Sequence, residues 1–288
     1  MAAANMKAVK LRIRSIQNTM QITKAMQLVA ASKLRKAKEL ADQVKPYFET
    51  LHETLSEIAS GNSDFMSPYT KISGNEKWCY VVIAGDRGLA GGYNANLFRY
   101  VTEETKGREY TVLPIGKKAV EYFRVRHIPI LTEAFAEVAE LTVSDCFTIA
   151  DLLCREFREG SFGHVAVVYT EFVSMLSQVP AESSLLPLAD FNEKPQEKPQ
   201  GARNLILYEP DSETVFNEIV PKYLAGLLYG AVCESVASEL AARRTAMEAA
   251  TDNAGEMIEK LSLYYNRARQ AGITQEITEI VAGAEQSM

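Results

Sequence analysis

The chain has 288 residues, of which 47% are hydrophobic and 24% charged, so it is long enough to bury a sizeable core. Its formal net charge of −6 at pH 7 argues against general nucleic-acid binding, which requires a basic surface that displaces counterions from phosphates. No run of eighteen apolar residues is present and the N-terminus lacks the apolar core of a secretory signal. We therefore expect a cytoplasmic protein that meets a membrane only through its partners.

The first sixty residues predict one long helix. They contain no glycine and one proline, Pro46, and their apolar residues follow a 3-4 spacing in which thirteen of fifteen positions are apolar. This spacing is typical of a coiled-coil seam, and at about 1.5 Å per residue the helix is too long for one small domain. Glycine, asparagine and proline in residues 61–68 end it. The fifteen positions are Val9, Ile13, Ile16, Met20, Thr23, Gln27, Ala30, Leu34, Ala37, Ala41, Val44, Phe48, Leu51, Leu55 and Ile58.

The start of this helix is strongly basic. Nine lysines and arginines and no acid occur up to Lys38, and Glu39 is the first carboxylate. We therefore expect an acidic or polar surface to face this end of the chain.

Residues 75–210 follow a different, alternating pattern. Apolar runs at 78–85, 109–116 and 164–173 alternate with helical patterns at 117–126 and 144–160, which predicts an α/β domain with a parallel sheet. The polar, proline-bearing residues 191–203 predict an exposed loop, and residues 204–210 predict a last strand.

Residues 211–288 predict a second long helix, capped at its start by Asp211 or Ser212. Ten of its eleven seam positions are apolar, and Arg243 is the exception. Because each terminal helix has one apolar stripe and the chain leaves and re-enters a single body, we expect the two helices to pair antiparallel. The seam positions are Val236, Leu240, Arg243, Met247, Ala250, Ala254, Met257, Leu261, Tyr264, Ala268 and Ala271, and the spacing resumes in a new phase at Ile273, Ile277, Ile280 and Ala284.

The predicted fold class is therefore α/β: a long antiparallel coiled coil of the N- and C-terminal helices with an inserted Rossmann-like α/β domain. The expected domains are an N-terminal helix at 1–61, a central α/β domain at 75–210 and a C-terminal helix at 211–288 that pairs with 1–61.

The glycine-rich stretch "GDRGLAGGYN", residues 85–94, is the first candidate site. It lacks the lysine and hydroxyl of a P-loop and contains no GxGxxG, so nucleotide binding is disfavoured. We favour a tight turn after a strand, in which Asp86 and Arg87 pair locally and Asn94 or Asn96 caps the next helix. A subunit contact is the remaining alternative.

Other catalytic or metal chemistry has little support in the sequence. His52, His127 and His164 lie far apart, without cysteines or carboxylates at ligand spacing, and no hydrolase motif GxSxG is present. The four cysteines form no CxxC, which predicts reduced thiols. We therefore expect no catalytic residues, no metal and no cofactor.

Polar residues interrupt the two seams at Thr23, Gln27 and Arg243. They either fix the register of the paired helices or contact another protein. The second interpretation is favoured by residues 273–288, an amphipathic end that extends past the shorter N-terminal helix and leaves apolar turns that need a host.

Three stretches resemble the gamma subunit of F-type ATP synthases: residues 12–37, 86–96 and 250–284, which open with "RIRSIQNTMQITKAMQ", "DRGLAGGYNAN" and "ATDNAGEMIEKLSLYYNRARQ". The resemblance spans essentially the whole chain. It departs from many relatives at Gly85 and Ala90, and the cysteine-bearing insertion of chloroplast forms is missing.

The resemblance implies the function of a central rotor shaft. Such a subunit couples proton-driven rotation of the membrane c-ring to ATP synthesis or hydrolysis in the alpha and beta subunits, is bound by the epsilon subunit and is not catalytic itself. It implies a peripheral location on the cytoplasmic face of a bacterial membrane. By similarity, the beta-subunit contacts are Met26, Arg243, Gln270, Thr274 and Glu276, and the ring contacts are Tyr208 and Glu209.

Two other classes of function stay open from the sequence alone. The glycine loop leaves an α/β protein that binds a small molecule, and the long helices leave a static coiled-coil scaffold.

Overall fold

The computed structural model describes residues 2–61, 66–71, 74–188, 191 and 208–285. The chain divides into two compact units, and we describe each by itself. The paired-helix unit joins Met1–Ala31 with Arg243–Met288, and the α/β unit is Ser32–Ala242. Helix α1 (Ala2–Gly61) and helix α5 (Ser212–Glu285) contribute to both units. The division expected from the sequence, into a helix at 1–61, an α/β domain at 75–210 and a helix at 211–288, stays a prediction.

The α/β unit is built on a four-stranded sheet with the order β2-β1-β3-β4. Strands β1 (Trp78–Ile83), β2 (Tyr110–Ile115) and β3 (His164–Phe172) are parallel, which confirms the three predicted strands. The sheet is mixed, because β4 (Gln178–Leu186), which was not predicted, pairs antiparallel with β3. The predicted last strand at 204–210 lies largely outside the described residues, and Tyr208–Pro210 are not in a strand.

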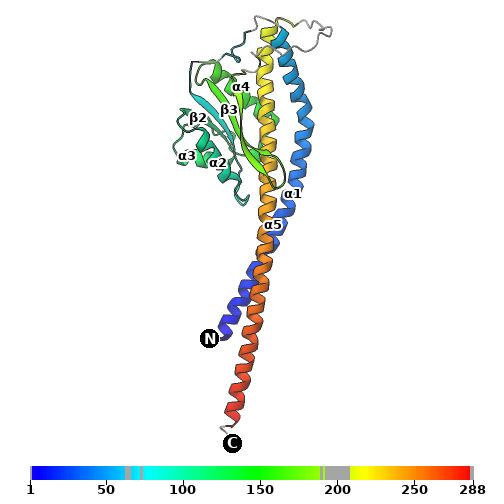
Figure 1. Ribbon diagram of the computed structural model, residues 1–288, viewed down its shortest axis with the longest axis vertical. Helices are drawn as coiled ribbons and strands as arrows, with labels where there is room; N and C mark the ends of the chain where they lie inside the picture. The colour runs from blue at the N-terminus through cyan, green and yellow to red at the C-terminus, as the bar shows by residue number, and fades with distance from the viewer. Residues whose placement is uncertain (1, 62–65, 72–73, 189–190, 192–207, 286–288) are drawn as a thin grey trace. The chain divides into compact units, whose positions relative to one another are not determined.

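Helices cover both faces of this sheet (Figure 1). On one face lie α2 (Tyr93–Glu104) and α3 (Lys117–Val125), whose Leu97 and Phe123 pack with Tyr80 and Val82 of β1. On the other face lie α4 (Val143–Arg158) and the first part of α5, together with a short 3-10 helix, Val138–Glu140. Because both faces are buried, β1 is an apolar run without alternation, as parallel strands between helix layers require.

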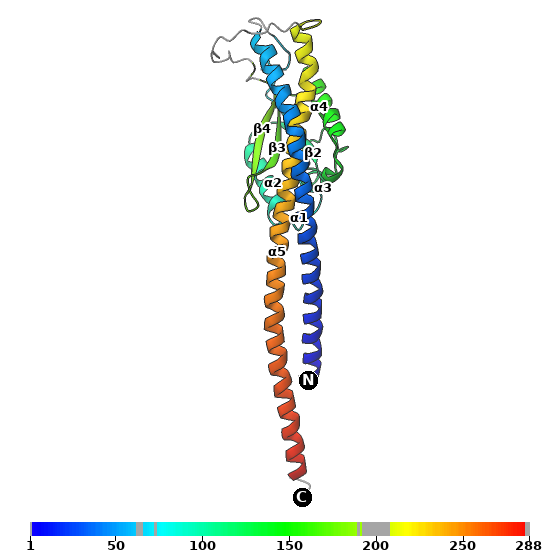
Figure 2. The ribbon, with the colours of Figure 1, turned by 90° about the vertical axis from the view of Figure 1, so that its right-hand side faces the viewer.

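The segments of α1 and α5 inside the α/β unit run antiparallel and close together (Figure 2). The ring of Phe48 lies over Gly226, where an added Cβ would come within 1.8 Å of the Phe48 Cδ1 atom. One turn further along α1, the ring nitrogen Nδ1 of His52 lies 3.0 Å from the Tyr223 hydroxyl. Glycine at 226 therefore permits the two backbones to approach with an aromatic ring between them.

Helix starts in this unit are fixed by side-chain caps. Thr142 and Asp145 form a capping box at the start of α4. At the start of α5, the Asp211 carboxylate accepts hydrogen bonds from the backbone N–H and the hydroxyl of Thr214, each at 2.8 Å. This confirms Asp211 as the predicted cap, and the same hydrogen bonds lower its pKa.

In the paired-helix unit α1 and α5 again run antiparallel. The Thr23 and Thr251 hydroxyls are 2.7 Å apart, and the Met6 methyl group lies 4.0 Å from the position of a Cβ on Gly272. Along the whole of α1, every predicted seam position is buried or half-buried, except that the Val44 side chain lies outside the described residues. The N-terminal register predicted from the 3-4 spacing is therefore confirmed.

Beyond Ala254 the predicted register of α5 is confirmed at Leu261 and Ala268 and wrong at three positions. Met257, Tyr264 and Ala271 are exposed, whereas their neighbours Ile258, Tyr265 and Gly272 are half-buried and continue the stripe. The seam thus runs 254, 258, 261, 265, 268 and 272, with a 4-3 instead of a 3-4 order. At each of these three positions the prediction chose the residue directly before the observed seam residue, because both residues of the adjacent pair qualify for the seam.

Past Gly272 the apolar residues of α5 face solvent. Within the paired-helix unit, α5 extends past the N-terminal end of α1 (Figures 1 and 2). The exposed fractions of Ile277 and Ile280 are 56% and 72%, and Ile273 and Val281 are similarly open. The side chain of Ala284 lies outside the described residues. By length and hydropathy α5 contains a stretch that would suffice to cross a membrane, but 78% of that stretch is buried inside the protein, as in a core helix.

Candidate functional site

The glycine loop follows β1 at the point where the sheet order reverses. β2 lies on one side of β1 and β3 on the other, and in open α/β sheets ligands bind beyond the carboxyl ends of strands at such a point. The loop is therefore in the right place for a ligand site, and its side chains decide whether it has the right chemistry.

Asp86 is the central side chain of this loop. Its carboxylate accepts hydrogen bonds from the backbone N–H groups of Lys117 at 3.2 Å, Val138 at 3.0 Å and Ala139 at 3.0 Å. The predicted local pair of Asp86 with Arg87 is wrong, because these three donors hold the carboxylate against the starts of α3 and the 3-10 helix. A carboxylate thus occupies donors of the kind that phosphate-binding loops offer to phosphate.

The predicted caps at Asn94 and Asn96 are also wrong. Helix α2 has Gly92 at its N-cap and no side-chain cap, and the Asn94 Oδ1 atom instead accepts a hydrogen bond from the Gly85 N–H at 2.9 Å. Across from Gly85 lies the buried Glu239 of α5, whose carboxyl carbon would be 2.9 Å from a Cβ at position 85. Glycine is required here because a carboxylate from α5 fills the space. The carboxylates of Glu239 and Asp86 therefore already occupy the space and the backbone donors that a phosphate would need.

Histidines and cysteines form no metal site in the described part of the chain, where no cluster of three or more His, Cys, Asp or Glu is found. His164 stacks on Trp78 with ring centroids 4.5 Å apart, and His127 is exposed in a turn. All four cysteines are free and buried, and burial raises the pKa of Cys79, Cys146 and Cys154 to about 12. Their thiols are therefore unreactive at neutral pH.

The polar interruptions of the seam differ in their surroundings. Thr23 is buried, its hydroxyl contacts the Thr251 hydroxyl, and Thr251 donates to the Met247 carbonyl at 2.8 Å. The Thr23–Thr251 pair thus satisfies both hydroxyls inside the stripe, which supports a role in register. Gln27 and Arg243 are half-buried.

The residues predicted to contact a beta subunit lie on both helices of the paired-helix unit. Met26 is half-buried, as is Arg243, whereas Gln270 and Thr274 are exposed one turn apart on α5. The Thr274 hydroxyl donates to the Gln270 carbonyl at 3.0 Å. Glu276 belongs to the same helix, and its side chain lies outside the described residues. Of the described side chains in this set, Gln270 and Thr274 are thus neighbours on one face of α5.

The basic side chains of α1 are exposed. Arg35 pairs with Glu39 at 3.6 Å on the surface, and the Lys38 ammonium lies 4.0 Å from the centroid of the Phe172 ring. Lys24, Lys33 and Lys36 are open to solvent. Such a row can attract acidic partners without fixing one geometry.

The predicted ring contacts lie just before α5. Tyr208 is half-buried against the core, and burial, followed by the charge of Glu57, raises its pKa. Glu209 is exposed.

Sequence reasoning missed two functional candidates: Glu239 behind the glycine loop and Thr251 opposite Thr23. Their partners are 154 and 228 residues away in the sequence, so only a contact map could have found them. The small residues near Thr251 were the only local sequence feature that pointed to a close contact there.

The fold and these surfaces define a protein in which an α/β body is inserted between two terminal helices that pair antiparallel. The family model described as "ATP synthase" matches residues 5–286. The chain is 48% identical over 283 residues to the ATP synthase gamma chain of Ruminococcus albus, covering 96% of each chain. It is 42% identical to that of Exiguobacterium sp. over 98% of each.

A solved structure has the same fold. One chain of the solved rotor of the Euglena gracilis mitochondrial ATP synthase superposes with a TM-score of 0.65 at 20% identity, covering 94% of this chain and 99% of that one. The chain belongs to the family of ATP synthase gamma chains, which are structural and not catalytic subunits of that complex.

Proposed function

We propose that this chain is the central rotor shaft of an F-type ATP synthase, turning with the c-ring and driving the catalytic beta subunits through their conformations. The observation that carries the proposal is the family membership over nearly the whole chain, together with a helix pair whose apolar end is uncovered. The nucleotide sites and the catalytic groups then belong to the alpha and beta subunits.

The uncovered end of α5 fits a shaft held in an apolar sleeve. Ile273, Ile277 and Ile280 present aliphatic surface without a partner among the described residues of the paired-helix unit. Apolar contacts are non-directional, so a sleeve around them excludes water without locking one angular position. Large exposed apolar patches of this kind mark interaction sites.

The contacts that select an angular position are polar. Gln270 and Thr274 lie exposed on α5, and we place them with Met26, Arg243 and Glu276 against a beta subunit. The exposed lysines of α1 add charge that can attract acidic segments of the beta subunits and exchange between them during rotation.

At the other end of the assembly, we place Tyr208 and Glu209 against the c-ring and expect the epsilon subunit to bind beside them. Tyr208 is anchored in the core while Glu209 is open, so the segment can present a charge from a fixed support. The chain would lie at the cytoplasmic face of the membrane, held there by its partners.

Cross-linking inside the assembled complex tests rotation directly. Met257 is 53% exposed at a level where α5 is still paired with α1, so a Met257→Cys link to a cysteine in a beta subunit cannot be bypassed by unwinding of the last turns. We expect oxidation to abolish coupled ATP turnover and reduction to restore it. A static scaffold predicts unchanged turnover, and that result would refute the proposal.

The chain provides good controls for this experiment. Its own cysteines are buried, so the introduced thiol is the reactive one. Lys106→Cys, in an exposed turn of the α/β unit, should leave turnover unaffected by the same oxidant. A small-molecule-binding function predicts instead that the isolated chain binds ATP stoichiometrically in equilibrium dialysis, whereas a glycine loop already filled by the carboxylates of Asp86 and Glu239 predicts no tight binding.

A further inference from the structure

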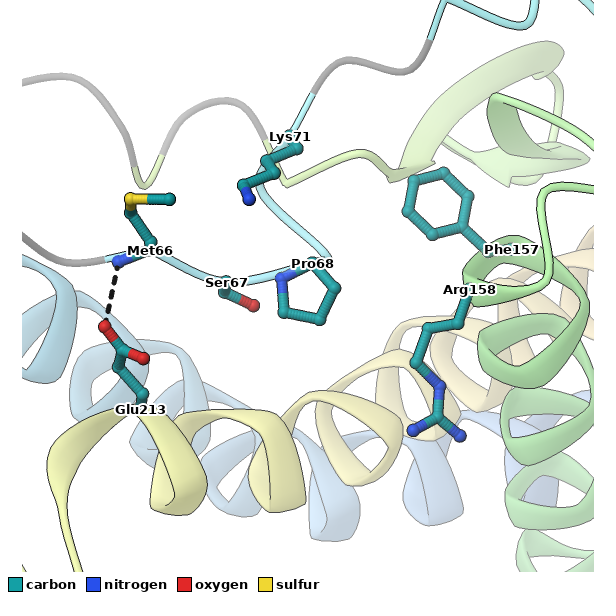
Figure 3. A pocket seen from close by; sticks show the side chains of 7 residues that line it. All are labelled: Met66, Ser67, Pro68, Lys71, Phe157, Arg158 and Glu213. Carbon is teal, nitrogen blue, oxygen red and sulfur yellow. Dashed lines mark hydrogen bonds between the residues drawn. The ribbon is translucent and has the colours of Figure 1, made fainter.

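Two surface features have no part in the proposed function. One is a pocket of about 390 Å³ in the α/β unit, between residues 66–71, the last turn of α4 and the first turn of α5 (Figure 3). Its cations Lys71 and Arg158 lie on opposite sides with Pro68 between them, so they define no common ligand position. The other is the outer face of α1 in the paired-helix unit, where a second line of residues has the spacing of a coiled-coil seam.

This second line lies on the face of α1 opposite the seam that packs on α5. Each member is two residues from a position of that seam, and two residues turn a helix by roughly 200°. All six members are exposed, and their spacing alternates between four and three residues. The exposed fractions of Leu11, Ile22 and Val29 are 60%, 60% and 55%. We call this line the outer seam, and its members are Leu11, Ser15, Asn18, Ile22, Ala25 and Val29.

The outer seam is confined to the paired-helix unit. Continuing its spacing beyond Val29 leads to Ser32, Lys36 and Glu39, which are polar and exposed. The seam toward α5 continues much further along α1, so the two lines have different lengths. Over its 18-residue span the outer seam is about 27 Å long, which is enough for several turns of a second helix.

The residues directly before the outer seam form a basic flank. Lys10, Arg14 and Lys24 each precede a member of the outer seam by one residue, and all three are exposed. No acid occurs in α1 before Glu39, although the whole chain has 37 acids and 31 bases. Positions that flank a coiled-coil seam pair with opposite charges on the facing helix. A helix that fills the outer seam should therefore be acidic along its own flank.

The basic flank also limits the other partners that this face can have. A second copy of the chain, packed outer seam to outer seam, would bring two basic flanks together, and like charges repel. A membrane surface suits a helix with one broad apolar face. The outer seam is instead narrow and carries Asn18 at its middle, as a seam that meets another helix often does.

We propose that the outer seam docks an acidic amphipathic helix of a neighbouring subunit, with the apolar residues of that helix on Leu11, Ile22 and Val29 and its carboxylates on Arg14 and Lys24. The inference deepens the proposed function and rests on it, because the chain has such neighbours only within the assembled complex. Asn18 then fixes the register of the docked helix at a cost in affinity.

Assembly of the full-length chain with the separately purified subunits of the complex tests the outer seam. The measured quantity is the apparent Kd of assembly, obtained by sedimentation velocity over a range of chain concentrations. We expect Leu11→Gln to raise this Kd about tenfold, because a leucine that the partner would cover is lost. Leu263→Gln is the matched control, since Leu263 is also 60% exposed but belongs to α5, and it should change the Kd by less than about twofold.

Two further variants separate a docking seam from a structural role. Asn18→Leu completes the apolar line and should lower the Kd of assembly, a gain that the free chain does not show in its thermal unfolding because Asn18 is exposed there. The double variant Arg14→Gln, Lys24→Gln should raise the Kd at low salt and make it less dependent on salt.

A cross-link identifies the helix that is docked. The native cysteines are buried, so Ile22→Cys can be labelled selectively with a photoreactive maleimide before assembly. We expect the linked peptide to come from another subunit and to have apolar residues at helical spacing flanked by acids. A link to a second copy of this chain, to lipid or to a segment without acids overturns the inference.

The outcomes distinguish this inference from the proposed function. Equal effects of Leu11→Gln and Leu263→Gln, or a higher Kd for Asn18→Leu, overturn the outer seam while the rotor proposal stands. A native chain that does not assemble with the other subunits overturns both. The helix content of each free variant, measured by circular dichroism, verifies that it is folded.

Discussion

The two units bury their apolar residues to very different depths. In the α/β unit, Val81, Val82 and Ile83 of β1 have no exposed surface. In the paired-helix unit, seam residues such as Val9, Ile13 and Leu261 stay half-exposed. Two paired helices bury only a narrow stripe, here small or central side chains such as Ala30 and Ala254, whereas two helix layers around a sheet enclose large ones. The α/β unit is therefore stabilised from within, and the paired-helix unit keeps surface for partners.

Removing a large core side chain from the α/β unit tests its internal stability most severely. Phe216 is fully buried and packs edge to face on Phe191, with ring centroids 6.0 Å apart. We expect Phe216→Ala to lower the free energy of unfolding by about 3–5 kcal/mol, as measured by urea denaturation. Leu263→Ala, at a 60% exposed site of the paired-helix unit, should change it by less than about 0.5 kcal/mol. Similar losses in both variants would abolish the contrast.

A charge in the helix seam separates the observed register from the one expected from spacing. Leu261 is half-buried in the stripe, and Leu261→Asp should cost roughly 1–3 kcal/mol in unfolding free energy because its carboxylate loses water. Met257 belongs to the expected seam but is exposed, so Met257→Asp should be nearly neutral. Equal destabilisation by both substitutions would favour the 3-4 order.

Local spacing was sufficient for α1 but not for α5. In α1 polar residues flank most seam positions, whereas in α5 Met257 adjoins Ile258 and Tyr264 adjoins Tyr265, so hydrophobicity could not choose between neighbours. Strand β4 was not predicted because Pro180 and several polar residues interrupt its apolar pattern. An edge strand tolerates such residues, since one side of it forms no ladder hydrogen bonds.

The glycine loop shows the same limit in the candidate site. Its turn character followed from the sequence, but the partners of Asp86 did not. Val138 and Ala139 are 52 and 53 residues away, and their N–H groups outcompete the adjacent Arg87 for the carboxylate.

The threonine pair tests whether the helix seam is specified by a hydrogen bond. The Thr23 and Thr251 hydroxyls lie 2.7 Å apart, so Thr23→Val leaves the Thr251 hydroxyl without this partner and should cost about 1 kcal/mol in unfolding free energy. The double variant Thr23→Val, Thr251→Val should recover most of that loss, since two apolar groups then meet. Additive losses in the double-mutant cycle would show that the hydroxyls do not interact.

The smallest expected effect concerns a buried carboxylate in the α/β unit. Burial, followed by the negative charge of Glu171, raises the pKa of Glu234, and its Oε2 atom is buried without a hydrogen bond in the described structure. Because the folded state then holds the proton more tightly than the unfolded state, this group favours folding at low pH. That contribution is lost as pH rises from the unfolded value near 4.5 through the raised folded value.

Replacing Glu234 by glutamine should therefore raise the free energy of unfolding at pH 7, by less than about 1 kcal/mol. The neutral amide avoids the cost of a buried charge and can still accept a hydrogen bond from the Phe172 backbone. The gain should shrink as pH falls below the unfolded pKa, where the native carboxyl is also neutral. Glu103→Gln, on the exposed side of α2, is the matched control and should show no such trend. A gain that is constant with pH would assign the effect to packing and not to the proton.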